Sequence, residues 1–182
     1  SYGCDVSLIN YDADMYLTDR IAFVNRGDFD LAAEIHLNAG GGTGSEVYYK
    51  HSDSRGKRLA AGISAGIAKT FSLRDRGAKI KLNSAGNDYF GFVRSVKCRS
   101  LLIETVFIDS SSDRKNVETE AGQRLCGKAI AESIAAFYGL KKTAPQKAKP
   151  VCDIRAGDRV KIIGKTYVTG QRIPSWVKLR TH

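Results

Sequence analysis

Apolar side chains recur at helical spacing in three parts of the chain. After Ser54, the side chains that repeat every four positions are Leu59, Ile63, Ile67 and Phe71. After Ser112, a longer stripe ends at Gly139 and consists of Val117, Cys126, Ile130, Ile134 and Phe137. A shorter stripe consists of Leu17, Ile21 and Val24. Because an α-helix turns once about every 3.6 residues, each stripe predicts an amphipathic helix with one face toward a core.

Apolar stretches without helical spacing predict strands between these helices. Residues 31–37 and 99–108 are the longest, and each is interrupted by titratable side chains. We expect the first to be a buried strand that ends at the glycine cluster 40–44, and the second to be a central strand. Residues 6–9 and 47–49 predict shorter strands. The alternation of strands and helices indicates an α/β fold, a mixed sheet flanked by helices.

The last 42 residues differ in composition from the rest. Residues 141–150 contain two of the three prolines and no large apolar side chain, which predicts a linker. Residues 151–182 alternate like the beginning of a small all-β unit. Residues 1–140 hold 18 Lys and Arg against 17 Asp and Glu, whereas residues 141–182 hold 11 against 2. The basic tail favours anionic partners, and residues 1–140 form the main domain.

Composition excludes several classes of protein. No apolar run approaches the roughly 20 residues that a membrane helix needs, and no signal peptide is visible. The cysteines are spread without close pairs and are Cys4, Cys98, Cys126 and Cys152. This spacing is not typical of zinc knuckles or disulfide scaffolds, so we expect free thiols, mostly buried.

Titratable side chains interrupt the two long apolar strands. His36 is followed closely by Asn38 at one strand end, and Glu104 lies in the middle of the other strand. Burying either group requires a partner or a function. Taken singly, His36 could be a hydrogen-bonded structural group, Glu104 could pair with Arg94 or Arg99, and Asn38 could form a turn. Together the residues indicate a site.

Two motifs resemble the zinc-dependent N-acetylmuramoyl-L-alanine amidases of the amidase-3 type, which include phage endolysins and bacterial autolysins. The first motif is EIHLNAGGGTGSEVYY, residues 34–49, and the second is LLIETVFIDSSSDRKN, residues 101–116. Residues 76–79, Arg-Gly-Ala-Lys, look like a further family position. The resemblance covers roughly residues 3–139.

The resemblance implies a role for each of four residues. His36 would be a ligand of Zn²⁺, and Glu104 would be the catalytic carboxylate that exchanges protons with zinc-activated water and the leaving nitrogen. Asn38 would orient His36 or bind substrate, and Arg76 would bind substrate. The expected reaction is cleavage of the amide bond between N-acetylmuramic acid and L-alanine in peptidoglycan.

The family pattern has two more zinc ligands, a histidine and a glutamate, before the position of Ser1. The remaining histidines, His51 and His182, match neither of them. Because a catalytic zinc usually keeps three protein ligands, we expect an incomplete zinc site in a fragment cut at both ends.

Residues 151–182 resemble the start of a bacterial SH3-like wall-binding domain. Tyr167 and Trp176 are candidate wall-binding aromatics, although in a small barrel an aromatic is more often part of the core. The expected partners are peptidoglycan and anionic wall polymers, without nucleic acid or membrane, and the chain is expected to be a monomer.

Two alternatives to an enzyme remain at this point. An amidase-like domain with an incomplete site could bind the cell wall without cutting it, and the missing ligands favour that alternative. A nucleic-acid-binding protein is suggested only by the basic tail. The amidase interpretation places the protein outside the cell or in the wall, or, for a phage endolysin, in the host cytoplasm until release.

Overall fold

A four-stranded mixed sheet forms the centre of the computed structural model, which describes residues 2–9 and 15–142. Its strands are β1 (Leu31–Asn38), β2 (Ser45–Tyr49), β3 (Asp75–Lys79) and β4 (Arg99–Phe107), in the spatial order β1-β4-β2-β3. β1 and β4 are parallel, β4 and β2 are antiparallel, and β2 and β3 are parallel. The expected mixed sheet and the interior position of β4 are confirmed.

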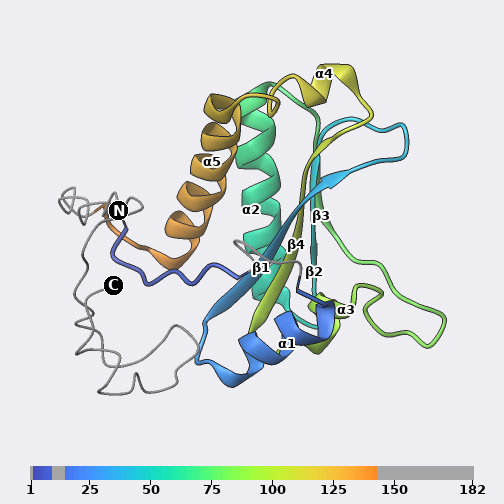
Figure 1. Cartoon of the computed structure of the whole chain (residues 1–182), viewed down its shortest axis with the longest axis vertical. Coiled ribbons are helices and arrows are strands. Elements are labelled where there is room, and N and C mark those ends of the chain that lie inside the picture. The colour runs from blue at the N-terminus through green and yellow to red at the C-terminus, as the bar shows by residue number, and fades with distance from the viewer. Residues whose placement is uncertain (1, 10–14, 143–182) are drawn as a thin grey trace, which may run out of the picture. The chain divides into compact units, whose positions relative to one another are not determined.

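Two long helices, α2 (Ser54–Phe71) and α5 (Glu120–Tyr138), pack on one face of the sheet (Figure 1). The apolar stripes expected from the sequence point into this core. Its buried members from the sheet and the helices include Val47, Leu59, Ile63, Ile67, Leu101, Ile103, Cys126 and Ile130. This layer fixes the orientation of β4, because alternate side chains of a strand point to opposite faces.

The other helices are shorter. α1 (Leu17–Arg26) and α3 (Gly91–Ser95) contribute Val24 and Phe92 to a second, smaller core. α4 (Ser111–Arg114) is a single turn. Within the described residues, no helix is long and apolar enough to cross a membrane.

The region after β4 differs from the expected single helix that begins at Ser112. The structure has two helices there, with Ser110 capping α4 and Thr119 capping α5 through Gly122 N–H. The physical reason is the buried side chain of Asp113, which accepts hydrogen bonds from backbone groups at the sheet and therefore holds the first turn there. Gly139 ends α5 as expected.

Of two strand predictions at the N-terminal side, one was wrong, and the other was confirmed as a strand but not as a buried one. Residues 6–9 form no strand. β1 is not buried, since Ile35 is 62% and Leu37 48% exposed. Among the described strands it pairs with β4 alone, at the edge of the sheet. An apolar sequence therefore did not distinguish an interior strand from an edge strand.

Three cysteines lie in the described part of the chain, and all three are free thiols as expected. Cys126 is buried and Cys98 half-buried, but Cys4 is exposed, so the expectation of mostly buried thiols holds only in part. Cys4 lies in the segment before α1, where no core is formed around it. Residues 143–182, which include most of the expected linker and the whole expected β unit, lie outside the described residues.

Candidate active site

Strand register brings His36 and Glu104 together. His36 is paired with Glu104 across parallel β1 and β4, and Glu46 is paired with Glu104 across antiparallel β2 and β4. Ile103 points into the core under α2 and α5, so its neighbour Glu104 points to the opposite face. The three titratable side chains therefore lie on the face of the sheet opposite α2 and α5, which is called the open face below.

The carboxyl group of Glu104 is half-buried and incompletely paired. Its Oε2 is buried and has no hydrogen-bond partner among the described residues. Burial raises the pKa of Glu104, and the neighbouring charge of Glu46 adds to that effect, while His36 lowers it. A carboxyl group in this state holds a proton to a higher pH than an exposed glutamate does, which favours a role in proton exchange.

The arginines that could have neutralised Glu104 are used elsewhere. Arg99 pairs with Asp53 at 2.8 Å. Arg94 donates to the backbone carbonyls of Asp88 and Tyr89. The salt-bridge alternative for Glu104 is therefore wrong.

His36 interacts with an acidic neighbour on its own strand. Its Nε2 lies 3.6 Å from Glu34 Oε2, and Glu34 Oε1 lies 3.1 Å from Arg20 Nε. The interaction with Glu34 raises the pKa of His36, against the effect of burial. Because a metal binds the neutral imidazole, a metal ion at His36 would compete with a proton.

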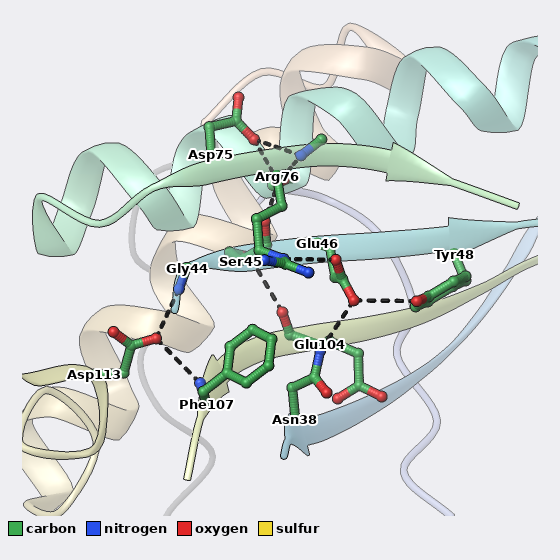
Figure 2. A network of polar contacts seen from close by, with 12 residues as sticks. Asn38, Gly44, Ser45, Glu46, Tyr48, Asp75, Arg76, Glu104, Phe107 and Asp113 are labelled. Carbon is green, nitrogen blue, oxygen red and sulfur yellow. Dashed lines mark hydrogen bonds and ion pairs between the residues drawn. The ribbon is translucent and has the colours of Figure 1, made fainter. Parts of the chain in front are cut away.

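Glu46 is the most fully paired carboxylate of the site, as Figure 2 shows. It accepts hydrogen bonds from Asn38 Nδ2 at 3.0 Å, Tyr48 Oη at 3.1 Å and Arg76 Nε at 2.7 Å. Burial opposes ionisation, but these donors outweigh it and lower the pKa of Glu46. Burial and the charge of Glu46 raise the pKa of Tyr48 to about 12. Glu46 is therefore an anion and Tyr48 a neutral donor.

Glu46 was not singled out in the sequence. It stands next to Ser45 at the start of a short strand, where a charged residue is ordinary. The signal that could have found it is period-two alternation, which places it on the same face as Tyr48.

Asn38 joins β1 to this network. Its amide nitrogen donates to Glu46, while its Oδ1 accepts from Ala39 N–H at 2.8 Å. The second contact is the turn-forming interaction considered as an alternative. No hydrogen bond links Asn38 to His36 among the described contacts, so Asn38 orients Glu46 instead.

The glycine loop after β1 is fastened to the segment after β4. Gly40 and Gly41 N–H groups donate to Asp109 Oδ2 at 2.8 and 2.7 Å, and Gly44 N–H donates to Asp113 Oδ2 at 2.7 Å. Gly44 has a φ of +104°, and a Cβ there would lie 2.2 Å from the carbonyl oxygen of Arg74. The loop therefore needs glycine at this position, and it holds the ends of β1 and β4 together.

The described residues fit a zinc site in kind but not in number. His36 offers an imidazole beside the unpaired oxygen of Glu104, yet no group of three His, Cys, Asp or Glu side chains within the described residues is placed to hold a metal ion. His51 is engaged with Asp88, with Nδ1 and Oδ2 3.0 Å apart. The wall-binding candidates Tyr167 and Trp176 lie outside the described residues.

Solved structures share this fold. Cwp6 from Clostridium difficile matches with a TM-score of 0.66 and 32% sequence identity, over 69% of this chain and 20% of that one. The catalytic domain of CwlV, an N-acetylmuramoyl-L-alanine amidase from Bacillus (Paenibacillus) polymyxa, matches with a TM-score of 0.61 and 22% identity, over 71% of this chain and 69% of that one. At that identity CwlV supports the fold alone.

Two of the curated relatives come from Bacillus subtilis. An uncharacterized protein, YqiI, is 31% identical over 132 residues, which is 70% of this chain and 60% of YqiI. A sporulation-specific N-acetylmuramoyl-L-alanine amidase is 29% identical over 140 residues, which is 75% of this chain and 52% of the relative. The chain thus matches little more than half the length of these relatives.

The family comparison covers the whole region in which the site lies. The model described as N-acetylmuramoyl-L-alanine amidase matches residues 1–136, which include every described site residue. It ends before the basic tail, so it says nothing about residues 137–182. The chain belongs to the Amidase_3 family of N-acetylmuramoyl-L-alanine amidases.

Proposed function

We propose that this protein hydrolyses the amide bond between N-acetylmuramic acid and L-alanine in peptidoglycan, with Glu104 as the catalytic acid and base and His36 as one ligand of a zinc ion. The observation that carries the proposal is the buried, unpaired Oε2 of Glu104 beside His36 on the open face of the sheet. The family and its amidase relatives support the same reaction.

Glu104 has the properties that amide hydrolysis requires. Its raised pKa lets the carboxylate accept a proton from the attacking water and keep it while the tetrahedral intermediate forms. Glu104 then gives that proton to the alanine nitrogen, which cannot leave as an anion. When bound, zinc supplies Lewis acidity toward the carbonyl oxygen of the substrate.

The proposal extends to the wall. Asn38 and Arg76 lie beside the catalytic residues and are the candidate substrate-binding groups, and Tyr167 and Trp176 in the basic tail are candidate wall-binding residues. A basic tail attached through a linker would raise the local concentration of the hydrolase on anionic wall polymers. The proposed location is therefore outside the cell or in the wall.

A second candidate function is wall binding without catalysis. It is favoured by the absence, within the described residues, of a third side chain that could complete a metal site with His36. Under this alternative the open face of the sheet would hold peptidoglycan, but no amino terminus of alanine would be released.

The two candidates are separated by incubating purified peptidoglycan with the protein and with Glu104→Gln, in buffer that contains zinc. The proposed hydrolase releases new alanine amino termini, and Glu104→Gln lowers that rate by about 100-fold or more while still binding to sedimented wall. Glu118→Gln, at an exposed position, is the matched control and keeps full activity. Wall binding without release by the wild-type protein would support the alternative.

A further inference from the structure

Arg76 is held from two sides on the open face of the sheet. Its Nε donates to Glu46 Oε2 at 2.7 Å, and the guanidinium carbon lies 5.0 Å from the centre of the Phe107 ring. Figure 2 shows the side chain reaching from β3 toward Glu46 on β2. The hydrogen bond to Glu46 fixes the direction of the guanidinium within its plane, and the contact with the Phe107 ring fixes the orientation of that plane.

Glu46, the carboxylate that holds Arg76, is itself fixed in position. Glu46 is 4% exposed and is also bound by Asn38 and Tyr48, so its carboxylate has one orientation. Because Glu46 uses only the Nε of Arg76, the two terminal nitrogens of the guanidinium make no hydrogen bond to any residue that the structure describes. The Arg76 side chain is 28% exposed, which leaves that edge open to a ligand.

The open edge lies beside the proposed catalytic group. Glu46, which holds Arg76, is the cross-strand partner of Glu104, and Phe107, which the guanidinium covers, follows Glu104 by three positions on β4. A substrate whose scissile amide reaches Glu104 would therefore place its next atoms near Arg76.

We propose that Glu46 and Phe107 orient Arg76 so that its terminal nitrogens bind a carboxylate of the peptide stem, next to the amide that is cut. This inference rests on the proposed function, and it assigns the specificity for substrate to the guanidinium of Arg76. The two terminal N–H groups of a guanidinium match a carboxylate with two parallel hydrogen bonds, which neither a lysine nor a neutral amide reproduces. Arg76 is the binding residue, and Glu46 is a positioning residue.

Binding without cleavage tests the inference. The probes are an N-acetylmuramoyl dipeptide with a free acidic second residue and the same dipeptide with its carboxyl groups amidated. Their dissociation constants are measured by NMR titration on the Glu104→Gln protein, which binds without turnover. We expect the acidic dipeptide to bind about tenfold more tightly than the amidated one.

Variants assign that preference to Arg76. Arg76→Lys keeps a positive charge beside Glu46 but loses the two parallel N–H groups of the guanidinium. We expect the preference for the acidic over the amidated dipeptide to fall to about twofold or less. Glu46→Gln, which removes the charged anchor, should reduce the preference in the same direction. Arg74→Gln is the control for general electrostatic attraction, because it removes one positive charge at an exposed position whose side chain makes no hydrogen bond or ion pair with the described residues.

The outcomes decide between specific recognition and general attraction. An unchanged preference in Arg76→Lys, a loss in Arg74→Gln, or equal binding of both dipeptides by the parent protein would each overturn the inference. A folding defect alone would weaken the binding of both dipeptides equally and leave the ratio of their dissociation constants unchanged. Failure of the proposed hydrolysis would appear separately, as wild-type protein that shows the carboxylate preference but releases no alanine amino terminus.

Discussion

Glu46 and Glu104 occupy directly opposed positions on β2 and β4, yet one carboxylate is fully paired and the other has an unpaired oxygen. Opposed like charges destabilise a sheet unless one of them is neutralised. Arg76 neutralises Glu46. Burial is the main cause of the raised pKa of Glu104, and the charge of Glu46 adds to it. The pair thus separates a permanent anion, which positions side chains, from a carboxyl group that can exchange its proton.

Replacing Glu46 by Gln should destabilise the fold. Three donors converge on this buried side chain, and the Gln amide would turn an N–H group toward at least one of them. We expect a loss of about 2 kcal/mol in the free energy of unfolding, measured by urea denaturation. Glu118→Gln on the exposed face should change it by less than about 0.5 kcal/mol. Equal stabilities for the two variants would show that the network contributes nothing.

Two glycine substitutions should act in opposite directions. Gly44→Ala forces a Cβ to within 2.2 Å of the Arg74 carbonyl oxygen at a φ of +104°, so we expect a loss of about 2 kcal/mol or more. Gly62→Ala lies on the exposed side of α2 with no atom within 4 Å of the new Cβ, and should stabilise by about 0.5–1 kcal/mol. Thermal unfolding of both variants measures the effects. Destabilisation by Gly62→Ala would contradict the open space at that position.

The ion pair of Asp53 and Arg99 predicts a pH dependence of stability. Burial alone would raise the pKa of Asp53, but the Gly56 N–H and Arg99 outweigh it and lower the pKa below the ordinary 3.8. A lowered pKa means that the stabilisation is present above the unfolded-state value and is lost as the pH falls through the folded-state value. Asp53→Asn keeps an N-cap for α2 and removes the charge.

We therefore expect Asp53→Asn to lose about 1 kcal/mol of stability at pH 7. The difference from wild type should begin to shrink near pH 3.8 and disappear only below the lower, folded-state pKa, because Asp53 is then protonated in both states. Urea denaturation at pH 7, 5 and about 2 measures it. A difference that persists at the lowest pH would mean that the Asn side chain perturbs the cap rather than the charge.

The sequence predicted those elements whose pattern has a single physical explanation. The stripe from Leu59 to Phe71 fits a helix and no other element, and the apolar stretch around Glu104 fits an interior strand. β3 was missed because Asp75, Arg76 and Gly77 give it the composition of a turn. The segment forms a strand because its backbone pairs with β2, and local composition does not predict such a long-range contact.

The candidate site was predicted in part for a related reason. His36 and Glu104 were visible because each interrupts an apolar stretch, and strand register then made them neighbours. The register between two strands cannot be predicted from either strand alone. The third titratable residue of the site, Glu46, was therefore not predicted. The edge position of β1 was likewise a property of the sheet order and not of the strand sequence.

Cysteine reactivity should follow burial. Cys4 is exposed, whereas burial raises the pKa of Cys126 to about 11, so almost none of the Cys126 thiol is ionised at pH 8. We expect iodoacetamide at pH 8 to alkylate Cys4 quickly and Cys126 only after denaturation, as followed by peptide mass mapping. Modification of Cys126 in the native protein at a rate similar to Cys4 would contradict the core packing under α5.

Zinc binding should depend on His36 and on pH. Because Glu34 raises the pKa of His36, protons compete with zinc to a higher pH than at an ordinary histidine, and zinc affinity should rise as the pH is increased from 6 toward 8. The described residues offer fewer than three ligands, so we expect weak, exchangeable binding that dialysis removes. Calorimetric titration with zinc at these pH values measures it, and His36→Ala should abolish the response while His51→Ala keeps it. Equal titration curves for wild type and His36→Ala would remove His36 from the site, and near-equimolar zinc retained through dialysis would mean that further residues complete it.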